Sequence, residues 1–146
     1  MSTFKPLQLA VASFFLSCLL WLTTLLGITT AHASDRDWVK HLSQEVFVEF
    51  AQQPDTVVID VRTKGEYARG YIPGAINMPH RDIISGKISL AAFKDKNVVF
   101  YCHTGVRAGI VTQYLDRNPT LSEGKVHHLK GDFRAWQARG KRIVKP

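Results

Sequence analysis

The sequence predicts an α/β fold, a small and mainly parallel sheet with helices on both faces, and three observations lead to this prediction. Short runs of β-branched residues alternate along the chain with stretches of helical periodicity. Two of these runs, residues 56 to 61 and 98 to 101, are apolar at nearly every position, which is typical of parallel strands buried on both faces. No internal repeat or low-complexity segment interrupts the alternation, so we expect one core covered on both sides.

The N-terminal segment differs from the rest of the chain. Residues 7 to 28 are almost wholly apolar, Lys5 precedes them, and residues 31 to 33 read Ala-His-Ala, a small-x-small cleavage site. We therefore expect residues 1 to 33 to be a secretory signal peptide and residues 34 to 146 to form one periplasmic or otherwise exported domain. The apolar stretch is also long enough to span a bilayer. The alternative is therefore an uncleaved anchor that holds the same domain outside the cytoplasm.

The elements expected within this domain follow one another in a regular order. They are a helix capped by Ser43 and reaching residue 53, the strand 56 to 61, a helix 64 to 69, an extended piece 75 to 79, a helical turn or two at 90 to 94, the strand 98 to 101, a helix 107 to 118, a strand 126 to 129 and a helix 133 to 139. Residues 81 to 89 have no clear pattern, because Gly86 breaks their apolar positions.

The charge of the chain argues against nucleic acid as a partner. The formal net charge is +7 at pH 7, and it becomes +6 for the exported domain because Lys5 is the only charged side chain of residues 1 to 33. The basic residues are spread along the chain and are not interleaved with aromatic ones, as a nucleic-acid surface would require. We interpret the charge as weak steering of small anions. We expect a monomer that contacts a membrane only if the N-terminal segment is uncleaved.

Cys102 is the residue at which the sequence places the chemistry. Cys18 lies within the predicted signal, so the exported domain holds a single cysteine and cannot form an internal disulfide. The simple alternative is a buried cysteine that packs as a small hydrophobic residue. However, Cys102 ends a buried strand, and four residues separate it from Arg107 at the start of a helix. Ligands of open α/β sheets bind at such a carboxyl end of a strand.

The loop after this cysteine has the composition of an anion-binding loop. The N–H groups of a helix's first turn carry partial positive charge, and a tight loop can aim further N–H groups at the same point. Gly105 suits a loop that must adopt positive φ or let an anion approach the backbone. A thiolate, the reactive form of cysteine, is stabilised in such a place and near an arginine. The predicted binding loop consists of His103, Thr104, Gly105, Val106 and Arg107.

The side chains of this loop are expected to contribute less than its backbone. His103 can tune the thiol or donate to the substrate, but its side chain points outward if the backbone amides point inward. Thr104 and Val106 would then act mainly through their N–H groups. Arg107 is the second residue to which we assign a role, as a positive charge beside the anion.

Three motifs occur in order between residues 56 and 136. Residues 102 to 107 read Cys-x-x-Gly-x-Arg, and the upstream motif combines Asp-Val-Arg at residues 60 to 62 with Ile-Pro-Gly-Ala at residues 72 to 75. The downstream motif at residues 129 to 136 reads Leu-x-Gly-Asp-x-x-x-Trp. Together these motifs resemble those of the single-domain rhodaneses, a family of sulfurtransferases.

The chain departs from the family pattern at two positions. Tyr71 stands where a histidine is common before Ile-Pro-Gly-Ala, and Asp132 replaces the second glycine of the downstream motif. Aspartate tolerates the left-handed backbone conformation better than most side chains. We therefore expect neither departure to change the fold.

The resemblance implies a rhodanese-like fold and a ping-pong reaction at Cys102. Its thiolate attacks the outer sulfur of thiosulfate, sulfite leaves, and the resulting persulfide passes its sulfur to cyanide or a thiol. The loop N–H groups and Arg107 can hold the anionic donor, and the covalent intermediate divides one transfer into two easier steps. The partners are then a small anionic sulfur donor and a thiophilic acceptor, and no metal or organic cofactor is needed.

Two other functions remain as alternatives. Phosphatases and arsenate reductases also place a cysteine thiolate in a loop closed by an arginine, but their spacing is Cys-x₅-Arg. The loop from Cys102 to Arg107 is one residue shorter, and the smaller loop suits one sulfur atom better than a tetrahedral oxyanion. A rhodanese-like binding module without catalysis is the other alternative. Such modules often lack the cysteine, which this chain keeps.

Polar residues at other strands are weaker candidates. Asp60 and Arg62 follow the strand 56 to 61 and can lie beside the loop. For Asp60 we favour a structural pairing with a basic group or a backbone N–H over catalysis, whereas Arg62 either binds the anionic substrate or lies at the surface. His127 and His128 are adjacent on a strand and face opposite sides of the sheet, so we do not expect them to share a metal ion.

Overall fold

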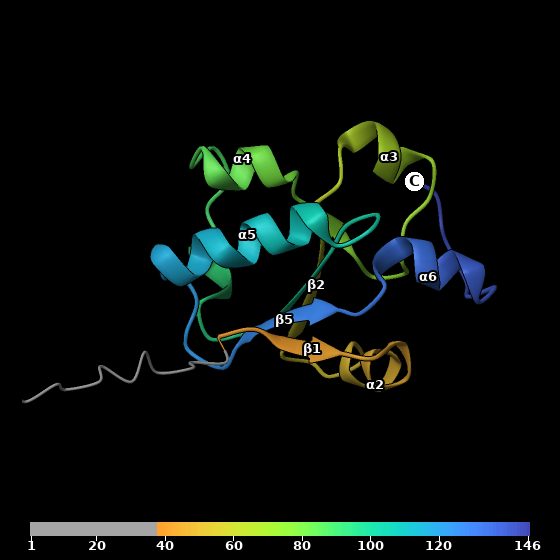
Figure 1. The fold of residues 1–146 in the computed structure, drawn as a ribbon, viewed down its shortest axis with the longest axis horizontal. Helices are drawn as coiled ribbons and strands as arrows, with labels where there is room; N and C mark the ends of the chain where they lie inside the picture. Colours follow the sequence, from red (N-terminus) through yellow and green to blue (C-terminus); the bar gives the residue numbers. More distant parts are fainter. Residues whose placement is uncertain (1–37) are drawn as a thin grey trace, which may run out of the picture. The chain divides into compact units, whose positions relative to one another are not determined.

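The computed structural model describes residues 38 to 146, and a five-stranded parallel sheet forms their centre (Figure 1). The strand order is β1-β5-β4-β2-β3, and each neighbouring pair is parallel. The strands are β1 (Lys40–Leu42), β2 (Thr56–Asp60), β3 (Ile76–Asn77), β4 (Asn97–Tyr101) and β5 (Val126–Leu129). The predicted signal peptide or anchor, residues 1 to 33, lies outside the described residues.

Helices cover both faces of this sheet, so the predicted fold class is confirmed. They are α2 (Gln44–Phe50), α3 (Lys64–Ala68), α4 (His80–Ile84), α5 (Val106–Arg117) and α6 (Asp132–Ala138), with a single 3₁₀ turn, η1 (Ala91–Phe93), within the described chain. Figure 1 shows α4 and α5 on one side of the sheet and α2 on the other, with α3 and α6 near the carboxyl ends of the strands.

The core consists of two apolar layers that the central strand β4 separates. Val98 and Phe100 belong to the layer under α4 and α5, whereas Val99 and Tyr101 belong to the layer that contains apolar residues of α2 and α6. All four are fully buried. Successive side chains of a strand point to opposite faces, so the unbroken apolar run of β4 follows from its contact with both layers.

Two elements were not predicted from the sequence. The strand β1 has only three residues and lies at the sheet edge, where Lys40 pairs with His127 of β5. The helix α4 begins after Pro79 without a side-chain cap. The strand β1 is too short to show a periodic pattern, and α4 has no capping residue to mark its start.

The helix α2 ends earlier than predicted, although its start is as expected. The Ser43 side chain accepts a hydrogen bond from the Val46 N–H at 3.3 Å and caps the helix, which ends at Phe50 and not at Gln53. Pro54 disfavours the helical conformation of the residue before it, which explains the early end.

Tyr71, the first departure from the family pattern, is accommodated by packing. Its ring stacks on Tyr67 with centroids 3.9 Å apart, and the Tyr67 hydroxyl donates to the Ala75 carbonyl at 2.7 Å. The Tyr71 backbone also pairs with Val144 in both directions, which fastens the C-terminal segment. The expectation that this substitution leaves the fold unchanged is therefore confirmed.

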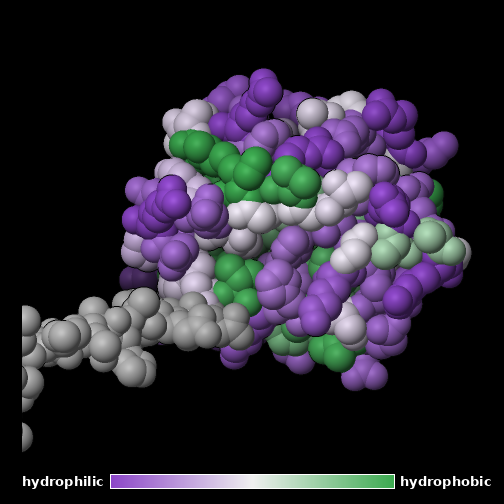
Figure 2. All heavy atoms as spheres, viewed as in Figure 1, coloured by the Kyte–Doolittle hydropathy of each residue, from purple (hydrophilic) through white to green (hydrophobic). Residues whose placement is uncertain are grey.

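Apolar side chains also reach the surface. Figure 2 shows an apolar strip on the face that carries α4 and α5. On α5, Val106 and Ile110 are 68% and 44% exposed, and Val106 begins the helix directly after the cysteine loop. No helix of residues 38 to 146 is both long enough and apolar enough to cross a membrane.

The two adjacent histidines of β5 occupy different environments. The His127 ring is buried against Phe50 with centroids 4.7 Å apart, and neither ring nitrogen has a partner within residues 38 to 146. Burial, together with the charges of Lys40 and Lys125, lowers the pKa of His127 to about 4. His128 instead contacts Asp132 at 3.1 Å. The two rings therefore lie on opposite sides of the strand, as predicted.

The buried His127 predicts that stability falls on mild acidification. In the unfolded chain its pKa returns to about 6.5, so between pH 6.5 and 4 the unfolded state binds more protons than the folded state. The free energy of unfolding should therefore decrease by up to about 3 kcal/mol across this window because of His127. Urea unfolding at pH 7.5 and pH 5 would measure the decrease. The His127→Leu variant should show a shallower pH dependence, and an unchanged slope would contradict the assignment.

Candidate active site

Cys102 lies directly after β4, at the carboxyl end of the central strand. Its side chain belongs to the apolar layer under α5, and the residue is 1% exposed. The loop from Cys102 to Gly105 then turns the chain into α5, which begins at Val106. A sulfur at this depth can be reached only by a small reactant or by a group inserted into the loop.

The first turn of α6 holds the backbone of Cys102. The Phe133 N–H donates to the Cys102 carbonyl at 3.1 Å, and the Arg134 N–H donates to the His103 carbonyl at 3.0 Å. In the other direction, the Cys102 N–H donates to the Asp132 carboxylate at 2.7 Å. Both backbone groups of the cysteine are thus fixed by a helix that begins 30 residues later in the chain.

The interior of the loop presents the backbone N–H group of Gly105 to the sulfur. The Gly105 N–H lies 3.1 Å from Cys102 Sγ. Gly105 is also the N-cap of α5, and because it has no side chain it leaves the first-turn N–H groups of that helix uncapped. These donors and the positive end of a twelve-residue helix favour negative charge on the sulfur and on any anion beside it.

Gly105 meets two requirements that only glycine satisfies here. Its φ is +98°, in the left-handed region, as the sequence predicts. A Cβ at this position would also lie 3.0 Å from Asp132 Oδ2 and 3.6 Å from the His128 ring. The loop therefore packs directly on the Asp132 and His128 pair, in which Nε2 of His128 lies 3.1 Å from the carboxylate.

Arg107 is paired with Glu66 of α3. Its two terminal nitrogens donate to the two carboxylate oxygens at 2.6 and 2.7 Å. The Glu66 hydrogen bonds raise the pKa of Arg107, and the Arg107 hydrogen bonds hold the pKa of Glu66 well below its usual range. The nearby Cys102 side chain also raises the pKa of Arg107, by less than Glu66 does. The arginine thus places its charge beside the thiol while its terminal nitrogens bind α3.

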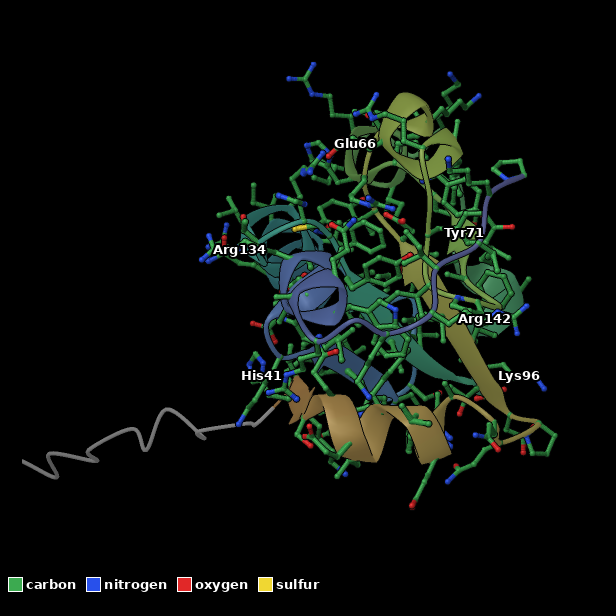
Figure 3. All side chains as sticks on the ribbon, turned by 90° about the vertical axis from the view of Figure 1, so that its right-hand side faces the viewer. His41, Glu66, Tyr71, Lys96, Arg134 and Arg142 are labelled. Carbon is green, nitrogen blue, oxygen red and sulfur yellow. The ribbon has the colours of Figure 1, made fainter. Side chains whose placement is uncertain are left out.

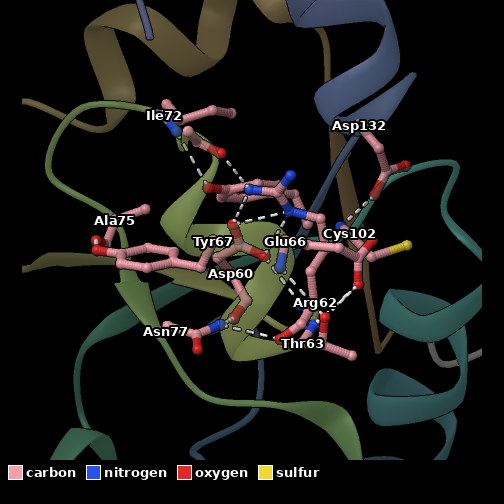
Figure 4. A network of polar contacts seen from close by, with 12 residues as sticks. Asp60, Arg62, Thr63, Glu66, Tyr67, Ile72, Ala75, Asn77, Cys102 and Asp132 are labelled. Carbon is pink, nitrogen blue, oxygen red and sulfur yellow. Dashed lines mark hydrogen bonds and ion pairs between the residues drawn. The ribbon is translucent and has the colours of Figure 1, made fainter. Parts of the chain in front are cut away.

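Asp60 and Arg62 form a buried ion pair behind this site (Figure 4). Arg62 Nε donates to both oxygens of Asp60, and its Nη2 donates to Asp60 at 2.5 Å and to the Gly70 carbonyl at 2.8 Å. The guanidinium carbon also lies 3.9 Å from the centre of the Phe133 ring. Burial opposes the charge of Arg62, but the bonds to Asp60 outweigh it and raise the pKa of the arginine.

The contacts of Asp60 and Arg62 connect the two residues to each other and to the chain around them. Asp60 pairs with the side chain and the N–H of Arg62, which are the kinds of partner that we expected for it. That its role is structural and not catalytic stays a prediction. Arg62 is 3% exposed, so it is not a surface arginine. That Arg62 binds the anionic substrate stays a prediction.

The side chains of His103 and Thr104 are exposed, on either side of α6. His103 borders a hollow between α3 and α6, and Thr104 borders another that Arg134 also lines. Viewed along α6, Arg134 points away from the body of the protein (Figure 3). Within residues 38 to 146, no cluster of three His, Cys, Asp or Glu side chains is placed to hold a metal ion.

Sequence reasoning missed the roles of Glu66 and Asp132. Glu66 lies between the two parts of the upstream motif, but no local pattern shows that it bonds an arginine 41 positions later. Asp132 was noted only as a replaced glycine, whereas its carboxylate holds the cysteine N–H. Asp132 has a φ of +53°, in the left-handed region that glycine adopts most easily. The glycine that is common at this position in the family was therefore the signal that could have indicated this backbone conformation.

Comparison with known proteins agrees with this architecture. The model of the rhodanese-like domain family matches residues 43–139. A sulfurtransferase of Allochromatium vinosum is 34% identical over 104 residues, which cover 71% of this chain and 92% of that protein. A rhodanese-like domain protein from Staphylococcus aureus is 26% identical with a TM-score of 0.56, covering 73% of this chain and 98% of that structure.

A second group of relatives contains the same kind of domain within a longer chain. The tRNA uridine(34) hydroxylase of Wolbachia pipientis is 34% identical over 110 residues, which cover 73% of this chain but only 38% of the hydroxylase. The domain therefore occurs in proteins with different names and different further parts. From the family match and the Allochromatium relative, the chain belongs to the rhodanese-like domain family.

The Asp132 contact predicts a difference between two substitutions. Asp132→Ala leaves the buried Cys102 N–H without an acceptor and places alanine at positive φ, so unfolding free energy should fall by about 2 to 4 kcal/mol. Asp132→Asn keeps an acceptor and tolerates this conformation, so its loss should be about 1 kcal/mol. Urea denaturation followed by tryptophan fluorescence measures both values. Asp116→Ala, at an exposed site on α5, controls for the lost charge, and equal losses at position 132 would contradict the acceptor role.

Proposed function

We propose that this protein is a sulfurtransferase that moves sulfane sulfur from thiosulfate or a similar anionic donor to a thiophilic acceptor through a persulfide on Cys102. The observation that carries the proposal is the position of Cys102 Sγ, which is 3.1 Å from the Gly105 N–H and beside the uncapped first turn of α5. Relatives that are named sulfurtransferases support the same reaction class.

The first half-reaction forms the persulfide. The Cys102 thiolate attacks the outer sulfur of thiosulfate, a new S–S bond forms, and the bond to the sulfonate sulfur breaks. Sulfite leaves with that electron pair, so the enzyme retains one added sulfur and one negative charge. The loop N–H groups stabilise this charge in the transition state and in the product. They are already in position before the reaction, so no reorganisation is needed.

The second half-reaction returns the enzyme to its thiolate form. Cyanide or a thiolate attacks the terminal sulfur, the new bond forms to the acceptor, and the S–S bond to Cys102 breaks. The pair of electrons returns to Cys102 Sγ. The covalent intermediate lets donor and acceptor use the same small opening in turn.

The short loop supports sulfur transfer over phosphoryl chemistry. Four residues separate Cys102 from Arg107, and both terminal nitrogens of that arginine already bond Glu66. A tetrahedral oxyanion in the loop would compete with Glu66 for those donors. A single sulfur needs only the backbone N–H groups, which Glu66 does not occupy.

The cellular site of this activity is part of the proposal. We propose that residues 1 to 33 direct the domain out of the cytoplasm, to the periplasm or an equivalent compartment, and that residues 7 to 28 anchor it there if they are not removed. The apolar stretch and the Ala-His-Ala sequence support this assignment.

The mass of the protein tests the proposed intermediate. After incubation with thiosulfate and removal of small molecules, the protein should gain the mass of one sulfur, which cyanide should remove with release of thiocyanate. The reason is that Cys102 Sγ is the nucleophile and the loop stabilises the charged product.

Cys102→Ser is the matched control for this experiment, because it keeps the size of the side chain and removes the nucleophilic sulfur. It should gain no sulfur and release no thiocyanate. A wild-type protein that stays unmodified with thiosulfate but hydrolyses an aryl phosphate would favour the phosphatase alternative. A protein that does neither would favour a binding module.

A further inference from the structure

A hollow of about 430 Å³ lies beside the cysteine loop, between α3 and α6. Its lining includes Arg62, Glu66, Arg69, His103 and Phe133. Such a volume is in the range of small-molecule sites and exceeds what thiosulfate or cyanide occupies. The reaction proposed above uses only the loop, so this hollow is not explained by it.

The hollow contains a buried charge with a free donor. The Arg62 side chain is 4% exposed, and its Nε and Nη2 are bound to Asp60 and Gly70. Its remaining nitrogen, Nη1, makes no hydrogen bond with any residue of the described chain, although Arg62 lines the hollow. This nitrogen is accessible from the hollow, since it is not one of the fully buried side-chain nitrogens and oxygens of residues 38 to 146 that lack a partner. It is therefore free to donate to a ligand that supplies an acceptor oxygen.

The other charged groups of the lining favour an anion. Arg69 is exposed at the rim and forms no ion pair with another residue between 38 and 146. The Glu66 carboxylate is neutralised by two bonds from Arg107, and a third bond comes from the Thr63 hydroxyl. The Asp60 charge is balanced by Arg62. One positive charge, that of Arg69, is therefore uncompensated.

The position of the hollow connects it to the reacting sulfur. His103 directly follows the nucleophile and lines the hollow, and Glu66 links the lining to Arg107 beside the thiol. Phe133, which supplies an apolar wall under the Arg62 guanidinium, donates its N–H to the Cys102 carbonyl. The hollow is therefore bordered by the residue that directly follows the nucleophile.

The hollow on the other side of α6 lacks these features. Its volume is about 460 Å³, and its lining combines Thr104 and Arg134 with small residues. Arg134 is exposed and points outward (Figure 3). Size alone therefore does not distinguish the two hollows, but the buried arginine does.

We propose that the hollow between α3 and α6 binds the carboxylate of a small thiol that accepts sulfur from the Cys102 persulfide. The carboxylate receives hydrogen bonds from Arg62 Nη1 and Arg69, and its short apolar chain lies along Phe133. The thiolate then reaches past His103 to the terminal sulfur. This assignment rests on the proposed sulfur transfer and names the chemical class of its acceptor.

The acceptor step follows from that placement. The thiolate of the bound acid attacks the outer sulfur of the persulfide, and an S–S bond forms between them. The bond to Cys102 breaks, and its electron pair stays on Cys102 Sγ. The product is a persulfide of the acceptor acid, and no oxidant or reductant is consumed.

Two acceptors of nearly equal shape test the proposal, 3-mercaptopropionate and its neutral amide. Protein carrying the Cys102 persulfide is mixed with each acceptor, and the loss of the added sulfur is followed by mass. The acid should react about tenfold faster than the amide at low concentration, the change expected for one charge-assisted hydrogen bond of modest strength. The two acceptors should differ in the acceptor concentration that gives the half-maximal rate.

Substitutions at the rim of the hollow distinguish binding of the carboxylate there from a general effect of the protein's net charge. Arg69→Gln and Gln137→Glu should each reduce the acid-to-amide ratio by about threefold or more, and Gln137→Lys should increase it, because Gln137 also lines the hollow. Arg117→Gln removes the same charge at the far end of α5, about 15 Å along the helix, and should leave the ratio unchanged. These residues are exposed, so the variants keep the core intact.

Two results would overturn the assignment. Equal rates for the acid and the amide with a fully loaded persulfide would do so, and so would equal effects of Arg69→Gln and Arg117→Gln. In both cases the sulfur transfer itself would stand, because the persulfide formed and reacted. Failure to load any sulfur on Cys102 would instead overturn the proposed function and, with it, the acceptor site.

Discussion

The docking of the cysteine loop on the first turn of α6 is the contact on which the site depends. The Cys102 N–H and carbonyl are bound to Asp132 and Phe133, and the His103 carbonyl is bound to Arg134. With its outer side fixed in this way, the loop directs the Gly105 N–H at the sulfur. The strand β4, buried on both faces, fixes the direction from which Cys102 enters the loop.

Two ion pairs extend this fixed geometry to the rest of the carboxyl edge. Asp60 and Arg62 join the end of β2 to the segment after α3, and Glu66 and Arg107 join α3 to α5. The Asp60 and Arg62 pair is buried, so loss of either partner would leave an uncompensated charge beside the site, whereas the side chains of Glu66 and Arg107 are 23% and 24% exposed. We expect these pairs to favour one arrangement of the elements around the site.

The sequence was sufficient for the features that depend on local pattern. The β-branched runs that became β2 and β4, the Ser43 cap of α2 and the positive φ of Gly105 each follow from a few neighbouring residues. Contacts between distant segments could not be predicted. Asp132 accepts from Cys102 across 30 positions, and β1 is too short for its pairing with β5 to leave a pattern. The roles of Glu66 and the free Arg62 donor depend on folded geometry in the same way.

The crystal structure of thiosulfate-treated protein tests the central claim, that the loop is built to hold one sulfur on Cys102. We expect electron density for a single added sulfur bonded to Sγ and directed at the loop N–H groups, with the Cys102 contact to Asp132 and the pair of Arg107 with Glu66 unchanged. An unmodified Sγ beneath a bound tetrahedral anion, with Arg107 released from Glu66 to bind it, would contradict the account.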